Sequence, residues 1–212
     1  MSTIAIIGTG LMANALGIGW TRAGHDVRIG TRSVENAGLE FEASFVGATD
    51  EAVEPAEVVV LAVPFPAVAP LVGALKDKLA GKTIIDISNP FDHLPDNARA
   101  AVEYTADALG TTDGLVAAFK DNFAATINAP LAADGHRPDV KVAADDPAAK
   151  AVVEKLVAEL DHRMLDCGPL HNARLIDPMV TLMLTLDRTY CDFTMKTGWR
   201  FFGLPDDAEN RA

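Results

Sequence analysis

The feature that most constrains the fold is a glycine turn between an apolar run and a helix-like segment near the start of the chain. Residues 4–7 form an unbroken apolar run, which is typical of a parallel strand covered on both faces. The next residues, Gly8-Thr9-Gly10-Leu11-Met12-Ala13, match the G-x-G-x-x-G/A pattern. Residues 11–23 have the pattern of a helix, and Gly24 is placed to end it. This order of strand, turn and helix predicts a βαβ unit whose turn binds phosphate.

The small residues of the turn each have a separate role in this prediction. Gly8 permits the tight turn, Gly10 lets the backbone approach a pyrophosphate, and Ala13 allows close packing of helix on strand. The anion would lie against the helix N-terminus. An ordinary glycine turn could have the same sequence, but the flanking βαβ pattern favours a nucleotide site. We therefore expect dinucleotide contacts from Gly8, Thr9, Gly10, Leu11 and Met12.

The end of the second strand indicates which dinucleotide is bound. Residues 27–30 predict that strand, and it leads into Thr31-Arg32-Ser33. NAD-binding proteins place Asp or Glu there, on the ribose 2′-hydroxyl. No carboxylate is expected at this tip, because Asp26 precedes the strand and Glu35 falls inside the following turn. Two hydroxyls and a guanidinium would suit a 2′-phosphate, since Arg offers a planar fork of charged donors. We therefore expect NADP at Thr31, Arg32 and Ser33, and a solvated arginine in a turn is the alternative.

Composition excludes several classes of protein. The chain has 212 residues, of which 49% are hydrophobic, so it can bury one sizeable core and a small annex. The longest apolar run, residues 58–63, is too short to span a bilayer, and the N-terminus lacks a signal-peptide pattern. A net charge of -12 argues against nucleic acid and anionic membranes as partners. Cys167 and Cys191 have no metal or redox spacing, so we expect no metal site and two free thiols in a reducing cytoplasm.

The remaining pattern predicts an α/β fold, a Rossmann-type doubly wound parallel sheet with a small C-terminal helical part. We assign residues 1–166 to an NADP-binding domain and residues 167–212 to a small helical C-terminal part, which is a candidate dimer interface. Asp50 is expected to cap a brief helix that ends at Val53. Further strands are expected at residues 45–49, 57–63, 83–88, 114–119, from 124 onward, 139–143 and 163–166, and helices at residues 34–45, 68–79, 97–109, 147–160 and from 170 onward.

Ligands of open α/β sheets lie beyond the carboxyl ends of the strands. Two predicted strands end in segments with this position, residues 62–64 and residues 88–90. A turn made by proline is expected in the first segment in any case, and Asn-Pro in the second could equally be an ordinary turn initiator. We expect cofactor contacts near the nicotinamide from Ala62, Val63, Pro64, Ser88, Asn89 and Pro90.

Together these motifs resemble the NADPH-dependent coenzyme F420 (deazaflavin) oxidoreductases. The likeness covers nearly the whole chain. Its most specific part is the Gly-Pro-Leu-x-Asn-x-Arg-Leu stretch that begins at Gly168, because the glycine fingerprint alone occurs in many unrelated enzymes. The segments that carry the resemblance are residues 8–13, 30–33, 62–64, 145–146, 167–175 and 198–202.

The resemblance implies hydride transfer between NADP(H) and a deazaflavin, coenzyme F420, with the two rings stacked between the nucleotide domain and the C-terminal helical part. In that family the protein mainly positions two cofactors, so no acid–base residue is required and we assign no catalytic residue. A cytoplasmic homodimer acting on small molecules is expected. On the acceptor side we expect Phe65, Phe119, Lys120, Asn122 and His171.

One departure from the family pattern concerns the acceptor. After the strand that ends at Phe119, members usually have His or Asn with a small apolar stretch, whereas this chain has Lys120-Asp121-Asn122-Phe123. Lys120 could hold an anionic tail or an electron-rich carbonyl of the acceptor, or it could be a solvated lysine at a strand end. The alternative acceptors are a flavin, a ferric complex or another small substrate.

Two rival classes share parts of this pattern. A hydroxyacid dehydrogenase of the 6-phosphogluconate type also carries Gly-x-Gly-Leu-Met, but it needs a catalytic Lys in a long helical domain, and here no Lys follows Gly168 before Lys196. A non-enzymatic NADP-binding sensor would show every nucleotide feature named above. The sensor therefore remains the second alternative.

Overall fold

The computed structural model describes residues 1–91, 98–129 and 136–204, and its central feature within these ranges is an eight-stranded sheet. The strands from the first edge through β6 are parallel; β7 is antiparallel to β6, and β8 is parallel to β7. In spatial order the strands are β3 (Phe45–Gly47), β2 (Asp26–Gly30), β1 (Thr3–Ile7), β4 (Val58–Leu61), β5 (Thr83–Asp86), β6 (Leu115–Ala117), β7 (Val140–Ala144) and β8 (Met164–Asp166).

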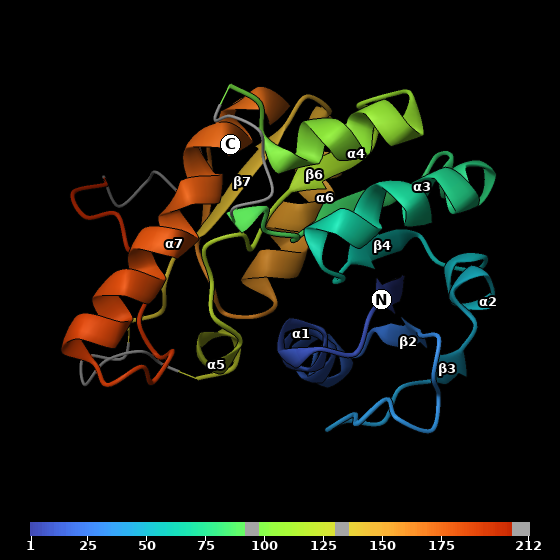
Figure 1. Cartoon of the computed structure of the whole chain (residues 1–212). Coiled ribbons are helices and arrows are strands. Elements are labelled where there is room, and N and C mark those ends of the chain that lie inside the picture. The colour runs from blue at the N-terminus through green and yellow to red at the C-terminus, as the bar shows by residue number, and fades with distance from the viewer. Residues whose placement is uncertain (92–97, 130–135, 205–212) are drawn as a thin grey trace.

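Helices cover both faces of this sheet (Figure 1). Side chains alternate along each strand, so Ile4 and Ile6 face one core while Ala5 and Ile7 face the other. The first core is closed mainly by α1 (Leu11–Arg22) and α6 (Pro147–Ala158), which the indole N–H of Trp20 joins by donating to the carbonyl of Leu156 at 3.0 Å. The second core is closed by α2 (Thr49–Val53), α3 (Phe65–Leu79) and α4 (Ala101–Leu109).

The strand order confirms the predicted doubly wound fold. The order from β3 through β6 is that of two βαβ halves meeting at β1 and β4, and a ligand crevice forms beyond the carboxyl ends at such a switch point. All four residues of β4 are buried, as expected for a strand covered on both faces. The predicted start of α6 is also confirmed, because the Asp146 carboxylate accepts hydrogen bonds from the N–H groups of Ala148 and Ala149.

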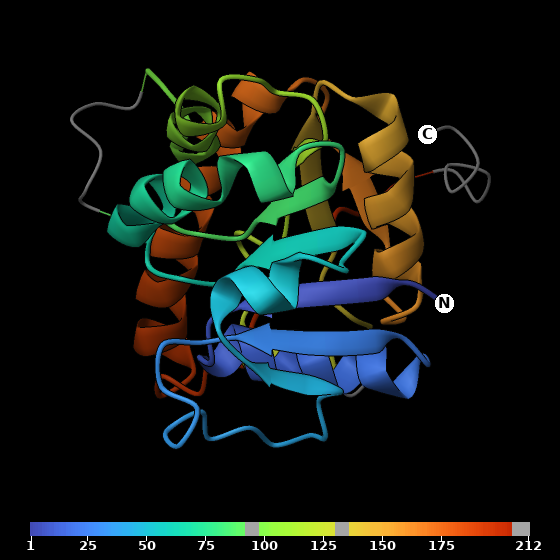
Figure 2. The ribbon, with the colours of Figure 1, turned by 90° about the vertical axis from the view of Figure 1, so that its right-hand side faces the viewer.

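The last helix of the described chain, α7 (Ala173–Tyr190), follows a short 3-10 turn, η2 (Leu170–Asn172). Figure 2 shows β1 running from the N-terminus toward the side of the molecule where α7 stands. The helix therefore flanks the edge at which the parallel strands end. None of the described helices is long and apolar enough to cross a membrane.

The prediction of a helix over residues 34–45 is wrong. The Ser33 hydroxyl donates to the Glu35 carboxylate at 2.8 Å, and the Asn36 amide donates to the Ser33 hydroxyl at 2.8 Å. Gly38 then adopts a left-handed φ of +55°. Short polar side chains that bond to one another in a turn compete with helical hydrogen bonding, and here the turn prevails.

Two smaller predictions also need correction. Residues from 124 form a helical turn, α5 (Ala124–Ile127), where a strand was expected. Asp50 lies in the first turn of α2 and does not cap it, because Ala48 occupies the N-cap position. The helix predicted from Asn97 begins at Ala101, and Asn97 itself lies outside the described residues.

Candidate functional site

The glycine turn between β1 and α1 is held against the ends of two neighbouring strands. Gly8 has a φ of +120°, and its N–H donates to the carbonyl of Gly30 at the end of β2, at 3.0 Å. A Cβ at Gly8 would lie 2.3 Å from the carbonyl oxygen of Ala62, just beyond β4. Because the turn needs both this φ and this close approach, only glycine fits the position.

Gly10 meets a different environment, although it is only two residues away. It is the N-cap of α1, with a φ of -73° and a ψ of -177°, and a Cβ there would find no atom within 4 Å. The first turn of α1 contains no acidic residue, and within the described structure no side chain caps the helix. The first N–H groups of α1 therefore have no side-chain partner in the described structure, and the space beside Gly10 is open, an arrangement suited to an anion. Thr9, Leu11 and Met12 are partly or fully exposed around it.

One residue that supports this turn was missed by the sequence analysis. The buried side chain of Asn14 donates to the carbonyls of Thr9 and Gly10, both at 3.3 Å, and its oxygen accepts from the N–H of Glu40 at 2.8 Å. It thus ties the glycine turn to the segment after β2. A polar residue on the buried face of a predicted helix was the signal that could have found it.

The tip of β2 carries the three residues predicted to read the ribose phosphate. The N–H of Thr31 donates to the carbonyl of Gly47 at 2.9 Å, and the Thr31 hydroxyl accepts from the N–H of Ser33 at 3.2 Å. Arg32 between them is exposed. These bonds fix the backbone of the tip and leave the guanidinium free to approach a ligand.

The expectation that no carboxylate reaches this tip is wrong. Glu35 accepts the hydrogen bond from the Ser33 hydroxyl described above. Backbone hydrogen bonding, together with this bond from Ser33, holds the pKa of Glu35 below its ordinary value, so the side chain is charged near neutral pH. A 2′-phosphate that bonded Ser33 would have to displace this carboxylate.

The segments beyond β4 and β5 lie on the same edge as the glycine turn. Ala62 and Val63 are partly exposed and Pro64 is exposed, whereas Phe65 begins α3 and packs edge to face on Tyr104 with ring centroids 5.9 Å apart. The helix begins earlier than predicted, because the prolines at positions 64 and 66 favour a helix start.

Beyond β5, two of the three predicted side chains face inward. Ser88 is buried, and both its N–H and its hydroxyl donate to the carboxylate of Asp86, at 2.8 and 2.6 Å. Pro90 is also buried. Asn89 is partly exposed, and its amide donates to the backbone carbonyl of Lys120 at 2.8 Å. Of this segment, Asn89 is therefore the residue best placed to meet a ligand.

The structure does not bring all five predicted acceptor residues to the surface. Phe119 is 1% exposed and packs edge to face on Trp20, and Lys120 is 0% exposed. Asn122 is buried and donates to the carbonyl of Asp139 at 3.2 Å. The interpretation of Lys120 as a solvated strand-end lysine is wrong, and direct contact of these three side chains with an acceptor is not supported by their burial. Phe65 is partly exposed and His171 is exposed.

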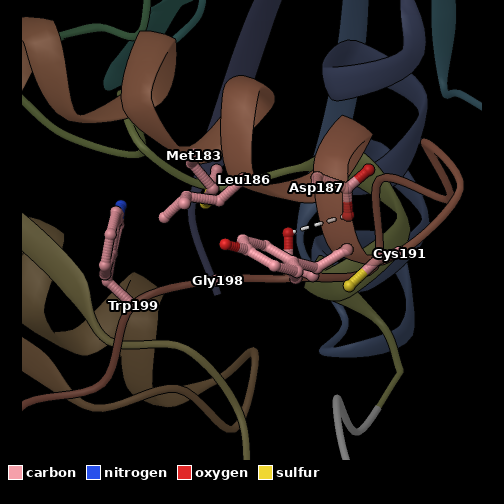
Figure 3. Close-up of a pocket in the computed structure, with 8 residues that line it drawn as sticks. Met183, Leu186, Asp187, Cys191, Gly198 and Trp199 are labelled. Atoms are coloured by element: carbon pink, nitrogen blue, oxygen red, sulfur yellow. Dashed lines mark hydrogen bonds between the residues drawn. The ribbon is translucent and has the colours of Figure 1, made fainter.

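An apolar pocket of about 340 Å³ lies between the second half of α7 and the segment that follows it. In Figure 3, Met183 and Leu186 of α7 point into the same space as Trp199. The carboxylate of Asp187 accepts from the N–H of Met195 and from the Thr197 hydroxyl, both at 2.9 Å, and these bonds hold the returning segment against the helix. The pocket is lined by Met183, Leu186, Asp187, Tyr190, Cys191, Thr197, Gly198 and Trp199.

Neither cysteine belongs to a metal cluster, since no group of three or more His, Cys, Asp or Glu side chains in the described part of the chain is placed to hold an ion. Cys167 and Cys191 are both free and partly buried. Burial raises the pKa of the Cys167 thiol, which makes it a poorer nucleophile.

Comparison with known proteins agrees with this geometry. Residues 3–90 match the family model described as "NADP oxidoreductase coenzyme F420-dependent". The F420-dependent NADP reductase of Methanothermobacter marburgensis is 31% identical over 210 residues, covering 87% of this chain and 92% of that protein. The rat metalloreductase STEAP3 is 31% identical over 187 residues, covering 85% of this chain and 37% of that protein. Among solved structures, a candidate F420-dependent NADP reductase from Arthrobacter sp. FB24 superposes with a TM-score of 0.82 at 26% identity, covering 96% of this chain and 100% of that one.

Proposed function

Because this chain belongs to the family of coenzyme F420-dependent NADP oxidoreductases, we propose that it transfers a hydride between NADP(H) and F420. The observation that carries the proposal is the turn at Gly8 and Gly10, whose open N–H groups at the start of α1 lie beside the ends of β2 and β4. The shape and chemistry of this edge fit a dinucleotide. Bound NADPH would supply the hydride itself, so the task of the protein is to hold and orient.

The adenosine end of NADP is assigned to the turn and to the tip of β2. Gly10 and its neighbours Thr9, Leu11 and Met12 would surround the pyrophosphate, and Arg32 would pair with the 2′-phosphate. Thr31 and Ser33 would add hydroxyl groups to the same phosphate once Glu35 releases Ser33.

The nicotinamide end is assigned to the crevice beyond β4 and β5. Residues 62–64 and Asn89 would form its floor, and the buried Ser88 and Pro90 would shape that floor from below. Residues 1–166 would then bind NADP, and the C-terminal part that begins at residue 167 would form, through α7, the opposite wall toward the acceptor. Phe65 and His171 are the predicted acceptor residues with exposed surface and remain in this proposal. We assign no acid–base residue, because bound NADPH would supply the hydride and solvent can supply the proton that F420 also takes up on reduction.

A spectrophotometric assay tests the reaction. Purified protein is mixed with NADPH and, separately, F420, free flavin, a ferric complex or no acceptor. Oxidation of NADPH that depends on F420 would support the proposal. Turnover with only a flavin or a ferric complex would mean that this compound, and not F420, is the acceptor. The ferric complex is included because the chain is similar to a metalloreductase. Tight binding of NADPH without turnover in any arm would favour the sensor.

A homodimer through α7 completes the proposal. The outer face of this helix exposes Leu175, Leu182, Leu186 and Tyr190, which lie at helical spacing along one side. Such an apolar stripe on a surface helix is typical of a protein interface. Leu186 and Tyr190 also line the apolar pocket, so the pocket adds to the apolar surface that a second copy could bury. Leu182→Glu should shift the protein to monomer in light scattering, whereas Thr181→Glu, also exposed on α7, should leave the dimer intact. A monomeric wild type would contradict this assignment.

A further inference from the structure

Lys120 is buried at a point where the backbone is strained. Its side chain has 0% exposure, and it follows Phe119, which adopts a left-handed φ of +56° just after the end of β6. A bulky residue in this conformation is uncommon and persists only where the surrounding structure enforces it. The left-handed conformation of Phe119 thus costs conformational free energy, and it sets the direction in which the chain leaves β6.

The ammonium group of Lys120 joins two elements that are distant in the sequence. It donates to the backbone carbonyl of Ser88, beyond β5, and it forms an ion pair with the Asp177 carboxylate of α7 at 3.1 Å. The second oxygen of Asp177 accepts from the N–H of Ala101, at the start of α4, at 2.8 Å. The backbone carbonyl of Lys120 in turn accepts from the amide of Asn89. One buried pair therefore ties the nicotinamide floor, α4 and α7 together.

Stability alone is a weak reason for such an arrangement. A buried ion pair is expensive to desolvate, and well-packed apolar side chains of similar volume usually serve a core at least as well. Its geometric effect is more specific, because the pair fixes the position of one element against another. Here the two elements are the segment 88–89, which belongs to the proposed floor under the nicotinamide, and α7, which belongs to the proposed wall on the acceptor side.

We propose that Lys120 and Asp177 are positioning residues whose ion pair sets α7 at the correct distance from the Ser88-Asn89 segment for hydride transfer. This inference rests on the proposed function. It gives Lys120 a role in the acceptor site that needs no contact with the acceptor, and it accounts for a charged residue where the family pattern has His or Asn. The glycine turn and the tip of β2, which would hold the phosphates of NADP, are not among the elements that the pair joins, so most of the NADPH affinity should be retained.

The test uses the double variant Lys120→Met/Asp177→Asn, together with both single variants. Each single variant leaves one buried group without its partner and should unfold more readily than the double variant. The double variant should fold and bind NADPH with a Kd within about twofold of the wild type. Its kcat with F420 should fall about 10- to 100-fold, because small displacements of a reacting group have effects of this size. A control, Lys78→Met/Asp50→Asn, removes an ion pair between α3 and α2 and should keep the wild-type kcat.

The possible outcomes distinguish the positioning role of the ion pair from the proposed reaction with F420. Selective loss of kcat with retained NADPH affinity supports positioning, since a merely structural pair would lower the melting temperature without this split. A double variant with wild-type kcat and KM would overturn the inference and leave the proposed function intact. A double variant that loses NADPH affinity and kcat together would also overturn it. Wild-type protein that does not turn over F420 would overturn the proposed function and the inference with it.

Discussion

Replacing Gly10 by alanine should separate cofactor binding from folding. The φ of -73° and ψ of -177° are open to alanine, and the new methyl group meets no protein atom within 4 Å. The free energy of unfolding should therefore change by less than about 1 kcal/mol. The same methyl group would project into the space through which a pyrophosphate approaches the start of α1. Loss of one or two charge-assisted hydrogen bonds from backbone N–H groups would weaken NADPH by about 2 to 3 kcal/mol, or roughly 30- to 150-fold in Kd.

Gly8→Ala provides the contrasting variant from the same turn. Its φ of +120° is closed to alanine, and the Cβ would lie 2.3 Å from the carbonyl oxygen of Ala62. The turn must then distort, and we expect a loss of about 2 to 4 kcal/mol of unfolding free energy. Urea denaturation of both variants without ligand, and fluorescence titration of both with NADPH, measure the two effects separately.

Two results would refute the reasoning. If Gly10→Ala binds NADPH within about twofold of the wild type, the pyrophosphate does not lie on this turn. If Gly10→Ala destabilises the free protein as much as Gly8→Ala does, the open space beside Gly10 is not a property of the folded chain. Fluorescence titration of Gly10→Ala with NADH is the control, because NADH carries the same pyrophosphate and should lose affinity equally.

Three further predictions concern charged residues. Arg32→Ala should weaken NADPH by about 2 to 3 kcal/mol and NADH far less, since only NADPH carries the 2′-phosphate; calorimetric titration with both cofactors checks this, and equal losses would contradict it. Glu35→Gln should strengthen NADPH relative to NADH by roughly three- to tenfold in Kd, because it removes a negative charge beside the phosphate and leaves Ser33 with a weaker, neutral acceptor; an unchanged ratio in the same titration would disprove the competition. Asp146→Ala should cost about 1 kcal/mol of unfolding free energy as a lost helix cap. The N–H groups of Ala149 and Gly114 hold the pKa of Asp146 below its ordinary value. The stabilisation is therefore fully present when the pH lies above the ordinary pKa, and it is lost as the pH falls through the lowered pKa of the folded state. The unfolding free energies of wild type and variant, measured by urea denaturation, should accordingly converge in acid.

The parts of the fold that the sequence predicts well are those fixed by local interactions. The unit from Thr3 to Gly30 is specified by an apolar run, two glycines with separate steric roles and a helix end. The start of α6 is specified by Asp146 and the proline after it. The failed helix at residues 34–45 shows the limit of this approach. This segment has a helix-like composition, but three hydrogen-bonding side chains and a glycine form a turn instead. The geometry of these residues cannot be derived from the sequence alone.

One side of the candidate site could be predicted from local sequence, and the other could not. The proposed phosphate side depends on Gly8, Gly10 and Arg32, whose expected roles follow from the residue type and its distance from a strand end. The proposed acceptor side depends on contacts across the sheet. Lys120 can be recognised as buried only when its partner is known to be Asp177, and no periodicity or spacing connects these two positions. A lysine after a strand is normally solvated, so reasoning from residue type alone favours the wrong environment.

The change in direction of the sheet after β6 explains why the proposed acceptor side would be built from distant parts of the chain. Because β7 runs antiparallel to β6, its first residues lie beside the carboxyl end of β6. There the Asp139 carboxylate accepts from both Arg163 and the N–H of Phe201, which secures the segment after α7 to the start of β7. The proposed acceptor wall would thereby be assembled from elements that contribute little to the proposed NADP crevice. Substitutions in this wall should accordingly alter the choice of acceptor while NADPH affinity is retained, and this separation would let relatives that share the NADP-binding half serve different acceptors.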